Sequence, residues 1–161
     1  MSYTKTNWEN LPSTNTPINA TNLNKIEQGI KDNADDITLL KPVVLYANET
    51  GSNSSITLSE SSANFDYIEI FYKSNDDYYN SLKIYKPNGK MASLSCWYTF
   101  TSEAGTYLKV KTVNISGTTI SNVTKTGGKS AYAEVNITTD SDKVTKSSSN
   151  YIWITRVIGY K

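Results

Sequence analysis

A polar stretch between two β-like segments holds the residues best suited to bind a ligand. It places two carboxylates beside two tyrosines, with Asn75 and Asn80 as polar partners. Flat aromatic faces next to hydrogen-bonding groups suit a ligand that has both apolar and polar sides. Trp97 and Tyr132 are further aromatic candidates, although ordinary packing also explains each aromatic taken alone. The predicted ligand-binding residues are Tyr78, Tyr79, Asp76, Asp77 and Trp97.

The residue types argue against catalytic and metal chemistry. The chain has no histidine and a single cysteine, Cys96, which excludes histidine-based catalysis, intrachain disulfides and the common zinc sites. Glycoside hydrolysis needs two carboxylates about 5–10 Å apart across a cleft. The carboxylates considered lie in no motif: Asp66, Glu69, Asp76, Asp77, Glu103 and Glu134. The Asp76–Asp77 pair also lacks the spacing of an EF-hand calcium loop. We therefore expect no enzyme, no cofactor and no metal, and a small buried side chain at Cys96.

The composition indicates one domain with an appendage. The chain has 161 residues, with 16 basic and 15 acidic side chains and a net charge of +1. No basic stripe suggests nucleic acid or an anionic membrane as a partner. The apolar runs are too short to span a bilayer, and the first seven residues have no apolar signal core. We therefore expect no membrane segment and no signal peptide.

Residues 42–161 must position the ligand-binding residues. From Pro42 the apolar residues recur with a period of two, in eight or nine short segments that turn signals separate. This pattern is typical of an antiparallel β-sandwich. Within it we expect a polar loop from Lys73 to Asn80. The apolar positions change side near Thr112, which predicts a β-bulge there. Turns are predicted at Gly51–Ser54, Ser59–Asn64 and Pro87–Lys90.

Two of these segments are apolar on both faces, from Phe65 to Tyr72 and from Tyr151 to Tyr160. A strand that is apolar on both faces is covered on both faces. One interpretation is a central strand with a loop folded over its outer side. The other is that one face joins the domain core and the opposite face forms a subunit interface.

Residues 19–41 predict a coiled-coil helix. Apolar residues follow heptad spacing, and one asparagine fills the remaining core position. The predicted seam consists of Leu23, Ile30 and Ile37 at positions a, and Ile26, Asn33 and Leu40 at positions d. The mixture of leucine and isoleucine favours three strands or more, and Asn33 would fix the register at a cost in stability. The alternative is an amphipathic helix that packs on its own domain.

The first 18 residues predict an extended arm. Trp8, Leu11 and Ile18 are apolar but have no local core. Because a tryptophan is costly to leave in water, we expect this arm to pack against another protein.

The N-terminal segments resemble the signature of tail fibre and receptor-binding proteins of phages that infect Gram-positive bacteria. The resemblance covers residues 8–30 and rests on Trp8–Pro12, Thr16–Ala20, Asn22–Glu27 and Gly29–Ile30. Later segments are similar in character to those of the same proteins, namely Leu45–Tyr46, Ile56–Ser59, Phe65–Ile70 and Ile154–Tyr160.

The resemblance implies a homotrimer in the phage tail, made in the bacterial cytoplasm. Its arm would dock onto other tail or baseplate proteins, its helix would form a neck, and its β-domains would bind a cell-surface glycan. The chain is shorter than such proteins usually are, which leaves a prophage or bacteriocin particle open. Three functions therefore remain: a receptor-binding tail protein, a purely structural baseplate or fibre subunit, and a hydrolase of surface polysaccharide.

Overall fold

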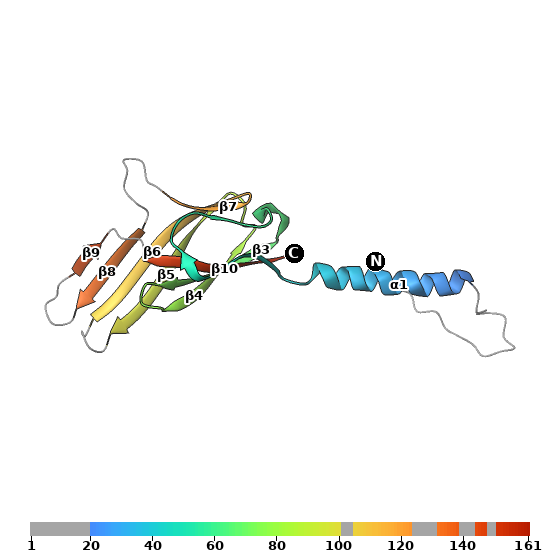
Figure 1. The fold of residues 1–161 in the computed structure, drawn as a ribbon, viewed down its shortest axis with the longest axis horizontal. Coiled ribbons are helices and arrows are strands. Elements are labelled where there is room, and N and C mark those ends of the chain that lie inside the picture. Colours follow the sequence, from blue (N-terminus) through green and yellow to red (C-terminus); the bar gives the residue numbers. More distant parts are fainter. Residues whose placement is uncertain (1–19, 101–104, 124–131, 139–143, 148–150) are drawn as a thin grey trace. The chain divides into compact units, whose positions relative to one another are not determined.

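The described part of the chain is mainly β, with one α-helix and two antiparallel sheets, in a computed structural model (Figure 1). The structure describes residues 20–100, 105–123, 132–138, 144–147 and 151–161, and only the backbone of Phe100 and of residues 132–138 and 144–147. The chain divides into two compact units, Met1–Lys41 and Pro42–Lys161. The predicted arm lies outside the described residues.

Helix α1 spans Ala20–Leu39 and lies within the range predicted from the heptad pattern. It ends at Leu39, shortly before Lys41 and Pro42, because the residue before a proline disfavours helical backbone. None of its residues is buried. The apolar seam residues are 37% to 75% exposed, with Ile26 the lowest and Leu40 the highest. Within the unit that contains the helix, the described residues therefore leave the seam uncovered. No described helix is long and apolar enough to cross a membrane.

One sheet has four strands in the order β1-β10-β3-β4, all antiparallel. Its two middle strands are the two that the sequence marks as apolar on both faces. Burial alternates along β3: Ile68 and Ile70 are buried, whereas Tyr67 and Phe71 on the opposite face are partly exposed. The strands are β1 (Val43–Ser52), β10 (Ile152–Tyr160), β3 (Tyr67–Ser74) and β4 (Tyr79–Tyr85).

The second sheet is built around one long strand, β6. This strand pairs along its whole length with β5 on one side. On its other side, β6 pairs with β8 and then with β7. Strand β9 pairs with β8, and strand β2 pairs with β7. The strands are β2 (Ile56–Thr57), β5 (Lys90–Phe100), β6 (Gly105–Ser116), β7 (Thr119–Asn122), β8 (Tyr132–Thr138) and β9 (Val144–Ser147). A short 3-10 helix, Ser62–Asn64, lies in the predicted turn before β3.

The two sheets share one hydrophobic core. Ile68 and Ile154 of the four-stranded sheet lie in the same cluster as Leu94 and Ile115 of the six-stranded sheet. Cys96 is 2% exposed and belongs to this core, which confirms that it is a small buried side chain. The Pro87–Lys90 turn also forms as predicted, with the backbone N–H of Lys90 donating to the carbonyl of Pro87 and Gly89 at φ +77°.

Three local predictions are wrong. The polar loop predicted from Lys73 to Asn80 is a tight turn, because β3 continues to Ser74 and β4 begins at Tyr79. The residues at these strand ends are mostly polar, and the sequence pattern therefore resembles that of a loop. The turn predicted at Gly51–Ser54 begins later, since Gly51 and Ser52 still belong to β1.

The β-bulge predicted near Thr112 is also wrong, because β5 and β6 pair in unbroken register past that residue. The inner face of β6 includes Lys109, Lys111 and Val113, all buried. Two lysines thus replace apolar residues at core positions. Leu108 and Val110 lie on the opposite face of the same strand, so the apolar positions change side without a bulge.

Candidate functional site

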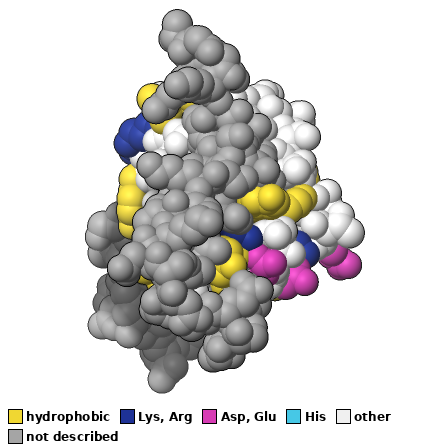
Figure 2. Space-filling view, turned by 90° about the vertical axis from the view of Figure 1, so that its left-hand side faces the viewer, with side chains coloured by type: hydrophobic (Ala, Val, Ile, Leu, Met, Phe, Trp, Pro, Cys, Tyr) yellow, Lys and Arg dark blue, Asp and Glu magenta, His cyan; other side chains and the backbone are white. Residues whose placement is uncertain are grey.

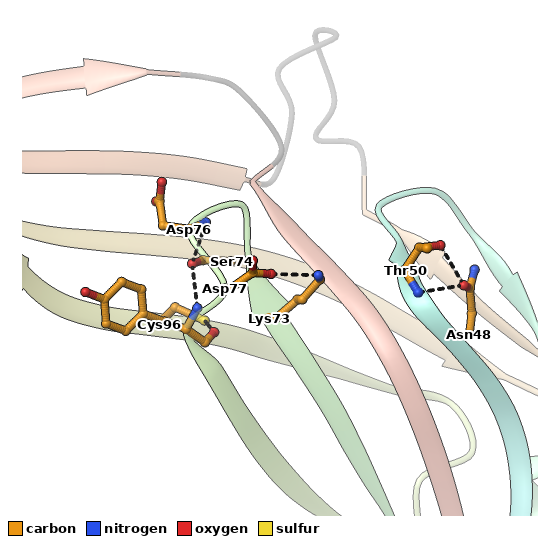
Figure 3. Close-up of polar contacts among 8 residues, drawn as sticks. Asn48, Thr50, Lys73, Ser74, Asp76, Asp77 and Cys96 are labelled. Atoms are coloured by element: carbon orange, nitrogen blue, oxygen red, sulfur yellow. Dashed lines mark hydrogen bonds and ion pairs between the residues drawn. The ribbon is translucent and has the colours of Figure 1, made fainter.

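One buried serine stabilises the turn between β3 and β4. Ser74 is fully buried, and its Oγ accepts hydrogen bonds from the backbone N–H groups of Asp76 and Tyr78, at 3.2 and 3.3 Å (Figure 3). Asp77 lies at φ +58°, a backbone conformation that aspartate tolerates better than most residues. Ser74 therefore fixes the direction in which the side chains of the turn point.

The predicted ligand-binding residues of this region divide into two groups. Tyr78 stacks on Tyr98 with ring centroids 4.0 Å apart, and the hydroxyl of Tyr98 donates to Asp76. Asp77 instead pairs with Lys73 at 2.7 Å. Lys73 also lies 5.8 Å from the ring centroid of Tyr79, which is 68% exposed. Asp76 and Tyr78 are therefore tied to the domain, whereas Asp77 and Tyr79 are open to solvent.

Trp97 belongs to neither group. It lies on β5 between Cys96 and Tyr98, which are both buried, so its side chain points to the opposite face of that sheet. The indole is 65% exposed, and its neighbour across the strand pair is Leu108. The structure thus does not bring the five predicted residues into one site. Tyr132 lies on β8, where only the backbone is described.

A depression of about 290 Å³ lies beside the open side of the turn. Trp153 of β10 is the aromatic residue among those that line it, and the Lys73–Asp77 ion pair supplies two charges. The lining residues are Thr50, Lys73, Ser74, Asn75, Asp77 and Trp153. On the face of the molecule shown in Figure 2, acidic and basic side chains lie next to hydrophobic ones. An aromatic face beside hydrogen-bonding groups is the arrangement that a saccharide site requires.

Strand β1 positions two parts of this depression. Gly51 has φ +80°, and a Cβ added there would lie 2.7 Å from the Cβ of Trp153, so only glycine lets the backbone approach so closely. Asn48 holds Thr50, since its Oδ1 accepts from the N–H and the hydroxyl of Thr50 at 3.1 and 2.8 Å (Figure 3). Trp153 and Thr50 were not predicted as site residues. The only sequence signal for Trp153 was its place on a strand with two apolar faces.

The pKa values of the charged side chains at this turn depend on their hydrogen-bond partners. The hydrogen bond to Asp77 raises the pKa of Lys73, so this lysine is protonated at neutral pH. Burial opposes the charge of Asp76, but hydrogen bonds from Lys109 and Tyr98 outweigh it and lower the pKa of the carboxyl. A carboxyl that is ionised at neutral pH is unsuited to act as a general acid. Burial raises the pKa of Cys96 to about 11, which makes its thiol unreactive.

The carboxylates considered for hydrolysis are engaged with other side chains wherever the structure describes them. Asp66 pairs with Lys86, and Glu69 accepts from the hydroxyl of Ser81 at 2.8 Å. Asp76 and Asp77 pair with different lysines. Glu103 lies outside the described residues, and only the backbone of Glu134 is described. No group of three potential metal-ligating acidic, histidine or cysteine side chains occurs among the described residues.

Comparison with known proteins gives no family for this arrangement: no protein-family model matches the chain, and no curated protein has a significantly similar sequence.

Proposed function

We propose that the chain forms a homotrimeric phage tail protein whose β-sandwich head binds a saccharide on the surface of a Gram-positive bacterium. The N-terminal resemblance over residues 8–30 supplies the class of protein. The uncovered seam of α1 supports the oligomer, and the depression beside Trp153 supports the ligand. The arm at residues 1–18 would attach the trimer to other tail or baseplate proteins.

The trimer is supported first by the helix. Six seam positions recur over Leu23–Leu40, and none of them is buried in a single chain. An exposed heptad seam is stabilised when identical helices bury it together. About three heptads are marginal alone, so the heads must contribute contacts of their own.

The outer face of the four-stranded sheet offers those contacts. Tyr67 stacks on Tyr160 with centroids 4.4 Å apart and lies 5.3 Å from the ring of Tyr85. Tyr85 is 65% exposed and Val44 of β1 is 44% exposed. Aromatic side chains are enriched in the buried centres of protein interfaces. This face is therefore the proposed contact between heads.

The single observation that carries saccharide binding is the depression that combines Trp153 with the Lys73–Asp77 pair. A sugar that binds there exchanges hydrogen bonds with water for hydrogen bonds with protein, so one site gives weak affinity. Three linked sites raise the overall affinity because later binding events become intramolecular. A trimer with three shallow sites thus suits adhesion to a surface that repeats the same sugar.

Two measurements on the full chain test this function. Sedimentation equilibrium at micromolar concentration should give three times the chain mass, and co-sedimentation with Gram-positive cell walls should show binding that free wall polysaccharide inhibits. A trimer that binds no wall polysaccharide would favour the structural subunit instead. Release of reducing sugar from the walls would favour the hydrolase, and a monomer would contradict the proposed assembly.

A further inference from the structure

Lys109 lies in an unusual position for a lysine. It is on the inner face of β6, and its side chain is 3% exposed. The Nζ atom contacts two side chains of the β3–β4 turn, the Oδ1 of Asn75 and, at 2.5 Å, the Oδ2 of Asp76. A buried primary amine therefore meets a carboxamide and a carboxylate of the exposed turn at the surface of the domain.

Aromatic rings surround this point. The Nζ of Lys109 lies 4.9 Å from the ring centroid of Tyr151, 5.2 Å from that of Tyr98 and 6.0 Å from that of Tyr107. These rings shield the amine of Lys109 from water, whereas Asn75 and Asp76 keep contact with solvent. The rings around Lys109 also hold its amine in place. The amine and the carboxamide of Asn75 therefore need no further ordering before they react, which raises their effective concentration.

We propose that Lys109 and Asn75 become joined by an isopeptide bond between their side chains, with Asp76 as the proton carrier. The reaction needs no oxidant and no co-reactant. Asp76 takes a proton from the ammonium of Lys109, and the neutral Nζ attacks the Cγ of Asn75. A new N–C bond forms, and Asp76 returns its proton to the amide nitrogen of Asn75. The bond from Cγ to that nitrogen breaks and the nitrogen leaves as ammonia. Asp76 then takes the second proton from Nζ, which becomes an amide nitrogen, and passes that proton to the departing ammonia.

The protonation states of Lys109 and Asp76 limit the rate of this reaction. The carboxyl of Asp76 has a lowered pKa, so the ion pair is the main form and the neutral, reactive pair is a minor one. The bond therefore forms slowly after folding, and the cross-linked fraction rises with time. Asp76 is placed for this role because it contacts the attacking nitrogen and also receives the hydroxyl hydrogen bond of Tyr98.

Two other lysines with described contacts lack this combination of groups. Lys86 pairs with Asp66, but both side chains are largely exposed, at 75% and 64%. Lys111 is buried, but its described hydrogen bonds go to the backbone carbonyls of Asn53 and Ile152. Among these three lysines, only Lys109 has a described contact that joins a buried amine to a side-chain carboxamide.

The bond would link the two sheets of the domain. Asn75 follows β3 of the four-stranded sheet, and Lys109 lies in β6 of the six-stranded sheet, 34 residues away in the chain. Asn75 also lines the depression beside Trp153. The cross-link would therefore hold that end of the domain against pulling and unfolding, whatever ligand the depression takes.

Intact-mass spectrometry of the folded full chain, stored until its mass no longer changes, tests the proposal. We expect a mass lower than that of the linear sequence by one molecule of ammonia. Peptide mapping must then find a branched peptide that joins Asn75 to Lys109. An unchanged mass would overturn the proposal. Loss of ammonia without a branched peptide would also overturn it, because asparagine cyclisation before Gly89 gives the same change. Loss of water with a branch at Asp76 would overturn the assignment to Asn75.

Three variants separate the roles. Lys109→Arg keeps the positive charge but removes the primary amine, and Asp76→Asn removes the proton carrier, so both should retain the full linear mass. Lys86→Arg is the matched control and should lose ammonia as the wild type does. A branched peptide in Asp76→Asn would contradict the role of Asp76. If either site variant fails to fold, the wild-type mass and the branched peptide still decide the proposal.

Discussion

The rings of Tyr78 and Tyr98 lie almost parallel, with centroids 4.0 Å apart and planes 6° from each other. Tyr98 in turn donates its hydroxyl hydrogen bond to Asp76, and its ring lies 5.5 Å from that of Tyr107. One half of the β3–β4 turn is thus attached to β5 by ring stacking and a hydrogen bond, although Tyr78 is 39% exposed. The other half, with Asp77 beside Lys73, faces the depression that we propose as the saccharide site.

This division predicts different effects for two adjacent tyrosines. Tyr78→Ala removes a stacked aromatic pair and should lower the free energy of unfolding by about 1 kcal/mol beyond the loss of buried area. Tyr79→Ala, whose ring is 68% exposed, is the control and should change it by less than about 0.5 kcal/mol. Urea unfolding of both variants measures the difference. Equal effects would contradict the structural role of Tyr78.

Lys111 should destabilise the domain at neutral pH. Its side chain is fully buried, and burial lowers the pKa of its amine to about 8. Lys111→Met removes a charge that costs free energy to bury, so it should raise the free energy of unfolding at pH 7 by about 1–3 kcal/mol. Lys86→Met, at an exposed position, is the control for a general loss of charge.

The same lysine predicts a pH dependence. Its folded pKa lies below the ordinary value of 10.5, so the unfolded chain binds more protons between pH 8 and that value. The free energy of unfolding of the wild type should therefore rise relative to Lys111→Met from pH 8 toward pH 10. Denaturation curves at several pH values measure this. A constant difference between the two proteins would show that Lys111 keeps its ordinary pKa when folded.

Gly159 should tolerate no side chain. A Cβ at this position would lie 2.5 Å from the ring of Phe65, which is 3% exposed and cannot move without disturbing the core. Gly159→Ala should therefore cost about 1–3 kcal/mol of stability. Phe65→Leu in the same chain should recover part of that loss if the clash is the cause. Purely additive losses would point to another cause.

Asn33 tests the coiled-coil register. If it occupies a d layer, Asn33→Ile should raise the melting temperature and broaden the distribution of oligomers, because a buried polar residue costs stability but specifies copy number. Sedimentation velocity and thermal melting measure both effects. Asn24→Ile, at an exposed position outside the seam, is the control. No change in either property for Asn33→Ile would mean that the heptad frame is wrong.

The sequence predicted the elements better than the contacts between them. Periodicity located α1 and most strands, and turn chemistry located Pro87–Lys90, because both signals are local. The inner face of β6 was misread because Lys109 and Lys111 occupy core positions, and only partners distant in sequence, such as Asp76 and Asn53, make that possible.

The candidate site shows the same limit. Asp77 lies at the depression, but Trp97 points to another face of the domain, and Trp153 was passed over. Whether an aromatic residue lines a site depends on which strands are neighbours. The pairing of β10 with β1 and β3 is a long-range relationship that residue spacing along one strand does not contain.

The central claim is that the depression beside Trp153 binds a saccharide of the Gram-positive cell wall. The most direct measurement compares the binding of two tryptophan variants of the full chain to purified wall polysaccharide. Trp153→Ala should reduce the affinity at least tenfold, while Trp97→Ala, which changes an exposed tryptophan on another face, should bind like the wild type. Both variants must keep the wild-type oligomeric mass and melting temperature. Unreduced binding by a folded Trp153→Ala variant would contradict the account.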